Sequence, residues 1–478
     1  MLSTAKTEFS DERRELMSKK QIIGIVGAVL VMIVSMFMPA MGEISQVGMR
    51  TIGMLAAFLI LLVTEALPVV VISLIFCALM PLLGVVPSFG KALSGYSEPI
   101  VFFTLASFGI AAALTNIPLS QRILRALLKA FGKNVGLVML SMMAACALFS
   151  SIVSNVPTCA IFMTLALNFL ELYDDEEDRK RSGRAFMIAI PVASMIGGMM
   201  TPAGSSINLL AIGQLEALTG TTVSFVQWMI AGIPLCLVMI PLSWWIMCKV
   251  YKPAEVTEAQ VQKFITSMAI PDKMSSKEKK VSVITIIMLI LWIASSWVKG
   301  INVMIVAMLG CCIMFLPGIR VLDVKTFLRD NSWDAFFLVG SVISIGNAMI
   351  NNGVSAAIAN AIPAMNVGLP VLLAVTAVLI FLTLVVIPVA SSMIPIMAVP
   401  LVAIATGADV SPTLIMLAAA LCAGNCYLLP LDTVPLITYA KGYYSMTDMA
   451  KSTAFLQIAM VILCALWLPL VGALMGIG

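Results

Sequence analysis

Histidine is absent from this chain of 478 residues, and only 11% of the residues are charged. Without histidine, the sequence lacks the commonest metal ligand and the commonest acid–base group of enzymes. The ten cysteines also include no Cys-x-x-Cys pair of the kind that binds zinc or supports redox chemistry. We therefore expect neither an enzyme nor a bound cofactor.

The scarcity of charge also indicates the environment of the chain. Soluble domains have about 25% charged residues, whereas this chain is 61% hydrophobic and has a mean hydropathy of +1.07. The uncharged runs 281–298 and 371–408 are long enough to cross a bilayer. Because hydrocarbon offers the backbone no hydrogen-bond partner, such runs predict an all-α membrane protein. The expected partners are the lipid bilayer and a small solute, and no nucleic acid.

The order of polar and apolar segments predicts two halves that follow one extra span. Residues 1–20 are polar and basic, which predicts a cytoplasmic N-terminus, and 21–49 contain the first span. The first repeat is expected at 50–250 and the second at 281–478, with 251–280 as a polar linker between them. One span before two five-span units makes the repeats inverted relative to each other in the membrane.

Three charged segments are expected at the membrane surface. Residues 119–132 alternate apolar and basic side chains at helical spacing, which is typical of an interfacial amphipathic helix. The charged runs 174–184 and 277–280 are expected to be solvated loops.

Short polar breaks interrupt the apolar segments of both halves in the same order. They divide a hairpin at 134–170 (break at 154–158), a helix at 185–218 (break at 201–208), a hairpin at 369–407 (break at 390–395) and a helix at 412–440 (break at 430–435). Broken backbone survives in a membrane only where protein or a water-filled site receives its polar groups. Matched breaks in two halves are typical of the central site of a secondary transporter. We predict about eleven transmembrane helices and two re-entrant hairpins in inverted repeats.

The residues in these breaks are suited to an anion and a cation together. None of the four breaks contains Lys or Arg, but the N-terminus of a half-helix offers free N–H groups and about half a positive charge. Asn155, Ser205 and Thr433 add short hydrogen-bond donors. Freed carbonyls, with oxygens from Ser150 and Ser154, suit a hard cation such as sodium.

Four motifs in register resemble those of the divalent anion/sodium symporter family, which belongs to the ion transporter superfamily and includes dicarboxylate transporters. They are Thr-Glu-Ala-Leu-Pro at 64–68, the hairpin tip at 150–155, the Gly-Gly and Gly-Ser-Ser-Ile-Asn break at 197–208, and the second break with its downstream segment at 429–444. The resemblance covers essentially the whole chain. It implies a homodimer in which a scaffold part holds a moving transport part, an elevator mechanism, and dicarboxylates, citrate or sulfate as substrates.

The resemblance also implies a role for particular residues. The first sodium site would use Ser150, Ser154, Asn155 and Gly204, and the second Ala390, Ser392 and Asp432. The substrate would contact Asn155, Val156, Ser205, Met393, Thr433 and Val434.

Several of these positions depart from the family pattern. Val156 and Met393 stand where the family has threonine, and Ser392 where it has asparagine. Each change removes or alters a polar contact. The departures predict that the substrate is recognised differently from the dicarboxylate members, and they put the second cation site in doubt.

Asp432 is the least expected residue, because the family has a small residue there. A carboxylate near the bilayer midplane costs about 2.5–3.5 kcal/mol, so it normally has a partner or a function. Asp432 could bind sodium, titrate to couple protons, or accept a hydrogen bond from the substrate. It could also simply cap the half-helix that follows.

Taken together, the residues predict a secondary active transporter in the cytoplasmic membrane. Its expected substrate is a small organic anion, a di- or tricarboxylate such as succinate, malate or citrate, moved by cation-coupled symport or by anion exchange. The coupling ion would be sodium or a proton. The main alternative is a cation/proton antiporter or an inorganic-anion permease of the same superfamily, for which Asp432 would be the supporting feature.

Overall fold

The computed structural model describes residues 18–268, 270–361, 367–386 and 390–477. These residues form helices joined by short connections, and within them the sole β-type pairing is one bridge between Met41 and Ile44. The prediction of an all-α membrane fold is confirmed.

Helices of the first half include the two broken segments. They are α1 (Lys19–Phe37), α2 (Gln46–Thr64), α3 (Val69–Leu82), α4 (Phe89–Ala92), the 3₁₀ turn η1 (Ser94–Ser97), α5 (Pro99–Thr115), α6 (Leu119–Phe131), α7 (Val135–Val153), α8 (Asn155–Leu170), α9 (Glu176–Gly198), the 3₁₀ turn η2 (Pro202–Gly204), α10 (Ser206–Thr219) and α11 (Phe225–Tyr251).

The linker contributes one short helix, and the second half follows it. These helices are α12 (Glu258–Ser267), α13 (Ser276–Ala294), α14 (Val303–Ile313), α15 (Val324–Asp330), α16 (Trp333–Asn351), α17 (Val354–Ala361), α18 (Leu369–Val386), α19 (Ala390–Gly407), α20 (Pro412–Ala423), α21 (Thr433–Tyr439) and α22 (Met446–Met475).

Among the described helices, six are long and apolar enough to cross a membrane alone. A seventh span results if α5 and α6, which meet at a bend of 61°, are counted as one. The broken segments contribute shorter apolar helices such as α8 and α20. The count of eleven spans and the inverted repeats therefore remain predictions.

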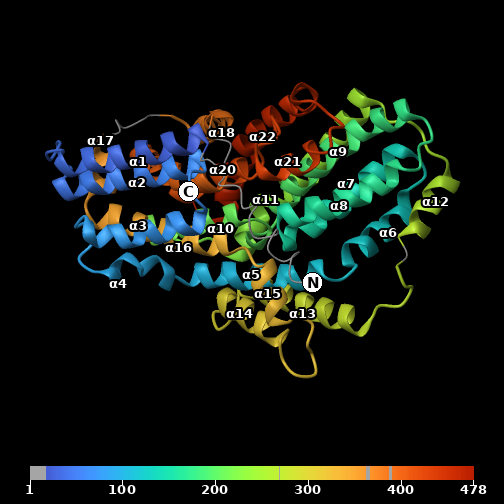
Figure 1. Cartoon of the computed structure of the whole chain (residues 1–478), viewed down its shortest axis with the longest axis horizontal. Coiled ribbons are helices and arrows are strands. Elements are labelled where there is room, and N and C mark those ends of the chain that lie inside the picture. Colours follow the sequence, from blue (N-terminus) through green and yellow to red (C-terminus); the bar gives the residue numbers. More distant parts are fainter. Residues whose placement is uncertain (1–17, 269, 362–366, 387–389, 478) are drawn as a thin grey trace, which may run out of the picture.

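Two groups of helices lie on either side of the broken segments (Figure 1). At one side, α1 packs on α2 and α3 packs on α16. At the other, α9 packs on α7, α8 and α11. The half-helix α10 contacts α16 of the first group as well as α19 and α20, so the breaks lie where the two groups meet.

Two charged runs predicted to be loops are helical instead. Helix α9 begins at Glu176 rather than at 185, because Asp175 caps it and acidic residues fill its first turn, where they complement the helix dipole. Helix α13 likewise includes 277–280, with Ser275 as its cap. The charges of both runs stabilise helix starts, which a reading by polarity alone does not reveal.

The predicted break at 154–158 is shorter than expected, and the one predicted at 390–395 is helical instead. Asn155 already belongs to α8, and 390–395 lie within α19. Pro157 stands in the first turn of α8, where a proline is tolerated because the N–H that it lacks would have no helical partner. In the first hairpin, the interruption is therefore a single residue, Ser154.

Candidate functional site

The tip of the first hairpin is held by a sharp turn at Ser154. Its φ of 89° lies in a region that residues other than glycine rarely adopt. Such a conformation costs on the order of 1–3 kcal/mol and persists where the surrounding structure imposes it. The turn brings α8 back against α7, and Asn155, the first residue of α8, is buried.

Three side-chain oxygens gather beneath this turn. The Ser150 hydroxyl donates a hydrogen bond to Oδ1 of Asn155 at 2.9 Å, and its oxygen lies 3.2 Å from that of Ser194. Ser194 also donates to the backbone carbonyl of Asn155 at 2.8 Å. Oxygen atoms in this arrangement are the ligands that hard cations prefer. Ser194 was not among the predicted site residues, since it lies in the middle of α9 without a motif around it.

Glycines allow the break between α9 and α10 to approach the tip of the first hairpin. A Cβ on Gly198 would lie 2.0 Å from Oδ1 of Asn155, and one on Gly204 would lie 2.5 Å from the Gly198 carbonyl oxygen. Gly204 and Asn155 therefore both lie against Gly198. The predicted first set of Ser150, Ser154, Asn155 and Gly204 is brought together by the fold.

The break between α9 and α10 is bridged by one asparagine. The Asn208 side-chain nitrogen donates to the carbonyls of Gly198 at 2.8 Å and Thr201 at 2.9 Å. These hydrogen bonds satisfy backbone groups that the broken helix leaves free. The N-terminus of α10 keeps its own cap, because the Ser205 hydroxyl accepts from the amide of Ile207 at 3.3 Å.

In the second half, a residue of a neighbouring helix satisfies the free backbone groups of the break. Gln457 of α22 donates to the carbonyl of Asn425 at 2.9 Å and accepts from the amide of Tyr427 at 3.0 Å. Both groups lie in the break between α20 and α21 and are fully buried. Sequence reasoning missed Gln457 because its partners lie about a full span away along the chain.

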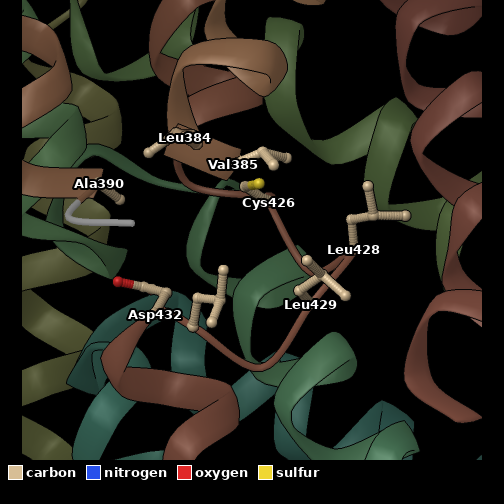
Figure 2. A pocket seen from close by; sticks show the side chains of 8 residues that line it. Leu384, Val385, Ala390, Cys426, Leu428, Leu429 and Asp432 are labelled. Atoms are coloured by element: carbon tan, nitrogen blue, oxygen red, sulfur yellow. The ribbon is translucent and has the colours of Figure 1, made fainter. Parts of the chain in front are cut away.

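Asp432 lies at the end of this break, directly before α21. Its side chain makes no capping hydrogen bond to α21, and the Thr433 hydroxyl approaches one carboxylate oxygen at 3.5 Å. The backbone amide of Ala390, the first residue of α19, also interacts with the carboxylate. Figure 2 shows the carboxylate extending from the turn on the side where Ala390 lies. The backbone amides of Thr433 and Val434, in the first turn of α21, interact with the carboxylate as well, so these contacts do not decide between the capping role and an ion-binding role for Asp432.

A small cavity of about 10 Å³ adjoins Asp432 and Ala390 (Figure 2). Asp432 is the one charged residue of its lining, which otherwise consists of Leu384, Val385, Cys426, Leu428, Leu429 and Leu431 together with Ala390. A volume of this size holds about one water molecule. A single ion or water fits there, and an organic substrate does not. The side chain of Ser392, the third predicted ligand, lies outside the described residues.

A much larger cavity of about 660 Å³ lies between the two groups of helices. One wall comes from the starts of α8, α10 and α21 and includes Val156, Ser206 and Thr433. The opposite wall includes Glu65 at the end of α2 and Asp334 at the start of α16. The volume is in the range of small-molecule sites.

The predicted substrate residues divide into two groups. Val156 and Thr433 line the large cavity, and the Val156 side chain is 44% exposed. Asn155 and Ser205 lie buried directly behind them, whereas Met393 and Val434 are buried and do not line it. The cavity also brings in Glu65 and Asp334, which were not predicted to contact substrate. Glu65 belongs to the motif at 64–68, and no sequence signal distinguishes Asp334.

Paired half-helices that open on a cavity inside a many-helix membrane protein are typical of secondary transporters. The family model for the sodium:sulfate symporter transmembrane region matches residues 19–477. The chain therefore belongs to this family of sodium-coupled anion symporters, and the resemblance found in its motifs is confirmed.

Curated relatives agree with this assignment. A sodium-dependent dicarboxylate transporter, SdcS, of Staphylococcus saprophyticus is 25% identical over 474 residues, which cover 93% of this chain and 90% of the relative. SdcS of Staphylococcus aureus is 24% identical over 468 residues, which cover 92% and 89%.

Solved structures share the fold at lower identity. The YdaH transporter of Alcanivorax borkumensis superposes with a TM-score of 0.57 and 13% identity, covering 96% of this chain and 99% of that one. MtrF of Neisseria gonorrhoeae, described as one of a class of antimetabolite efflux pumps, gives the same TM-score and identity and covers 96% and 95%.

Proposed function

We propose that this protein is a sodium-coupled carrier of small carboxylates. The observation that carries the proposal is the wall of the large cavity, where the starts of α8 and α10 meet without a basic side chain. Helix N-termini bind a carboxylate through N–H groups and the helix dipole. Names of the relatives point to the same substrate class.

Sodium would bind on the inner side of the same half-helices. The first ion would contact Ser150, Ser154, Asn155 and the backbone at Gly204, with Ser194 as an additional oxygen ligand. A cation there lies directly behind the amide of Asn155. It would both fix this side chain and add positive charge next to a bound anion.

The side-chain nitrogen of Asn155 is suited to the substrate. It makes no hydrogen bond to any described residue, while Oδ1 of the same amide accepts from Ser150. The amide would therefore present its oxygen to sodium and its nitrogen to a carboxylate. Thr433 and Ser205 would donate to the remaining carboxylate oxygens. Met393 and Val434, which are buried, would pack behind these donors.

A second monovalent cation would occupy the small cavity beside Asp432 and Ala390, with Ser392 as the third ligand that the resemblance implies. The cavity has room for one ion, and a bound cation would neutralise a carboxylate that no described Lys or Arg pairs with. Sodium and a proton are the two candidates. Either would link the charge of Asp432 to coupling rather than to substrate recognition.

We infer the orientation of the protein in the membrane from the distribution of its basic residues. Counting spans from a cytoplasmic N-terminus places every described Lys and Arg on the cytoplasmic side except Arg50, Lys91 and Lys299. Such asymmetry is the usual determinant of orientation. The large cavity includes Gln21 from the first turn of α1, so it would open toward the cytoplasm and represent an inward-facing state.

Transport by an elevator mechanism would move the group around α7–α11 and α18–α22 past α1–α5 and α13–α16. Two copies forming a homodimer in the cytoplasmic membrane would keep the second group fixed. Symport and exchange differ in whether the empty carrier can return, and both use the same sites.

The test is uptake of labelled succinate into proteoliposomes that contain the purified protein, with and without a sodium gradient, and with unlabelled succinate inside. Sodium-driven uptake supports a symporter of dicarboxylates. Uptake that needs internal succinate but no sodium supports exchange. Absence of uptake in both conditions, with citrate and sulfate equally inactive, contradicts the proposed function.

A further inference from the structure

The linker between the two halves is folded against both groups of helices. Its first part, from Tyr251 to α12, contacts the cytoplasmic ends of α8 and α9, and its last part, 270–278, contacts α6. We use the name strap for 251–268 and 270–278. Because the strap leads directly into α13, it connects the expected moving group to the expected fixed group.

The first part of the strap is attached by buried hydrogen bonds. The Tyr173 hydroxyl, after α8, donates to the carbonyl of Ala254 at 2.7 Å, and Ser182 of α9 accepts from the Ala254 amide at 2.9 Å. Gln260 of α12 donates to the Leu172 carbonyl at 3.2 Å. This part of the strap would therefore move together with α8 and α9.

The last part of the strap is attached to α6 by two arginines. Nε of Arg122 lies 2.6 Å from Oε2 of Glu278, in the first turn of α13, and Nη2 of Arg122 donates to the Lys273 carbonyl at 3.1 Å. Arg125 donates to the carbonyl of Ile270 at 3.0 Å.

The Arg122–Glu278 pair is unlike the other ion pairs of the described residues. Its side chains are only 12% and 6% exposed, whereas each of the other pairs has at least one partner more than half exposed. Removing one partner of a buried pair leaves an uncompensated charge and is strongly destabilising. A contact with this property is poorly suited to open and close in every cycle.

Helix α6 also packs on the moving group. Leu124 and Leu128 are buried on its inner face, and its Leu127 carbonyl accepts from Ser141 of α7 at 3.5 Å. One face of α6 thus contacts α7, while Arg122 on another face holds the start of α13. Helix α6 thus links α7 to the start of α13, alongside α5, which contacts both helices.

We propose that the Arg122–Glu278 contact is a permanent pivot that sets the rate at which the transport group moves. The proposal rests on the proposed carrier function. Arg122 and Glu278 are positioning residues, since neither lines the large cavity nor contacts the predicted ion ligands. Loss of the contact lets α6 detach from α13, so motion of α7 is no longer guided along one path.

The experiment compares Glu278→Gln, Arg122→Glu and the double exchange Arg122→Glu with Glu278→Arg. Uptake of labelled succinate gives turnover and half-saturation, and stabilisation of the detergent-solubilised protein by succinate and sodium reports binding independently. We expect each single variant to lose about tenfold or more in maximal rate, because a buried charge loses its partner. Half-saturation and ligand stabilisation stay within about twofold, and the double exchange restores the rate.

A matched control removes an exposed pair. Lys180 and Glu176 on α9 lie 2.7 Å apart but are 63% and 66% exposed, so Lys180→Ala should leave the rate unchanged. A Glu278→Gln rate equal to or above the wild-type rate overturns the pivot, since a faster rate would mean that the contact opens during the cycle. A double-exchange variant that folds but still transports slowly also overturns the pivot. If the wild-type protein shows no uptake, the proposed carrier function is refuted. That result separates failure of the carrier function from failure of the pivot.

Discussion

Gly198→Ala tests the geometry of the first cation site most directly. A Cβ at this position would lie 2.0 Å from Oδ1 and 2.8 Å from Cγ of Asn155. The contacted atoms belong to the end of a side chain, which can rotate, whereas α9 is packed between α7 and α8. We therefore expect Asn155 to turn away and its hydrogen bond from Ser150 to break, while the fold persists.

The size of the effect follows from the cost of the displaced amide. Adding a methyl group to a packed interior costs about 1–3 kcal/mol. If that cost falls on the sodium-bound form, the sodium concentration for half-maximal uptake rises by about 5–150-fold. We expect a larger effect on sodium than on succinate. The new Cβ would contact Oδ1 of Asn155, and this oxygen belongs to the cluster with Ser150 and Ser194 where sodium is proposed to bind.

The assay is succinate uptake by proteoliposomes as a function of sodium concentration, together with sodium-induced stabilisation against heat. Gly27→Ala serves as the control, since its nearest neighbour would be Cγ2 of Ile60 at 3.8 Å, an ordinary contact. An unchanged sodium dependence in folded Gly198→Ala would refute the placement of sodium beside Asn155. A change of the same size in Gly27→Ala would show that the assay reports general destabilisation.

Three further variants address other parts of the site. Asn155→Ala should abolish uptake while leaving membrane insertion intact, since it removes a proposed ligand of both the anion and the cation; full activity would contradict the proposed site. Asp432→Asn should alter the dependence of uptake on sodium or pH, because it removes the one charge of the small cavity; unchanged dependence on both ions would exclude coupling at this residue. Gln457→Ala should lower the thermal unfolding temperature, since two buried backbone groups lose their partner at a cost of about 1–3 kcal/mol each. Equal stability would mean that water replaces the amide there.

The positions of three of the four breaks could be predicted from sequence, because membrane segments have few residues that interrupt a helix. Pro157, Pro202 and Pro435 each mark the start of a short helix within a broken segment. The residue that makes the first turn could not be predicted. Ser154 adopts a positive φ although it is not glycine, and only its surroundings impose that conformation.

Partners distant in the chain account for most of what the sequence did not reveal. Glu278 stands in a lysine-rich run that reads as solvated, yet its partner Arg122 on α6 buries it to 4% exposure. Ser194 looks like one of many small residues of α9 until α7 places Ser150 beside it. Periodicity identifies the face of a helix, but it does not identify which helix will contact that face.

The two halves differ in how they hold charge, and this difference has a consequence for coupling. In the first half, Asn208 satisfies the backbone of the break and leaves neutral oxygens for an ion, so charge is present there only when ligands are bound. In the second half, Asp432 carries its own charge in a cavity that admits one ion. A fixed carboxylate inside a membrane costs about 2.5–3.5 kcal/mol. We therefore expect the second cation to bind before the first sodium and the substrate.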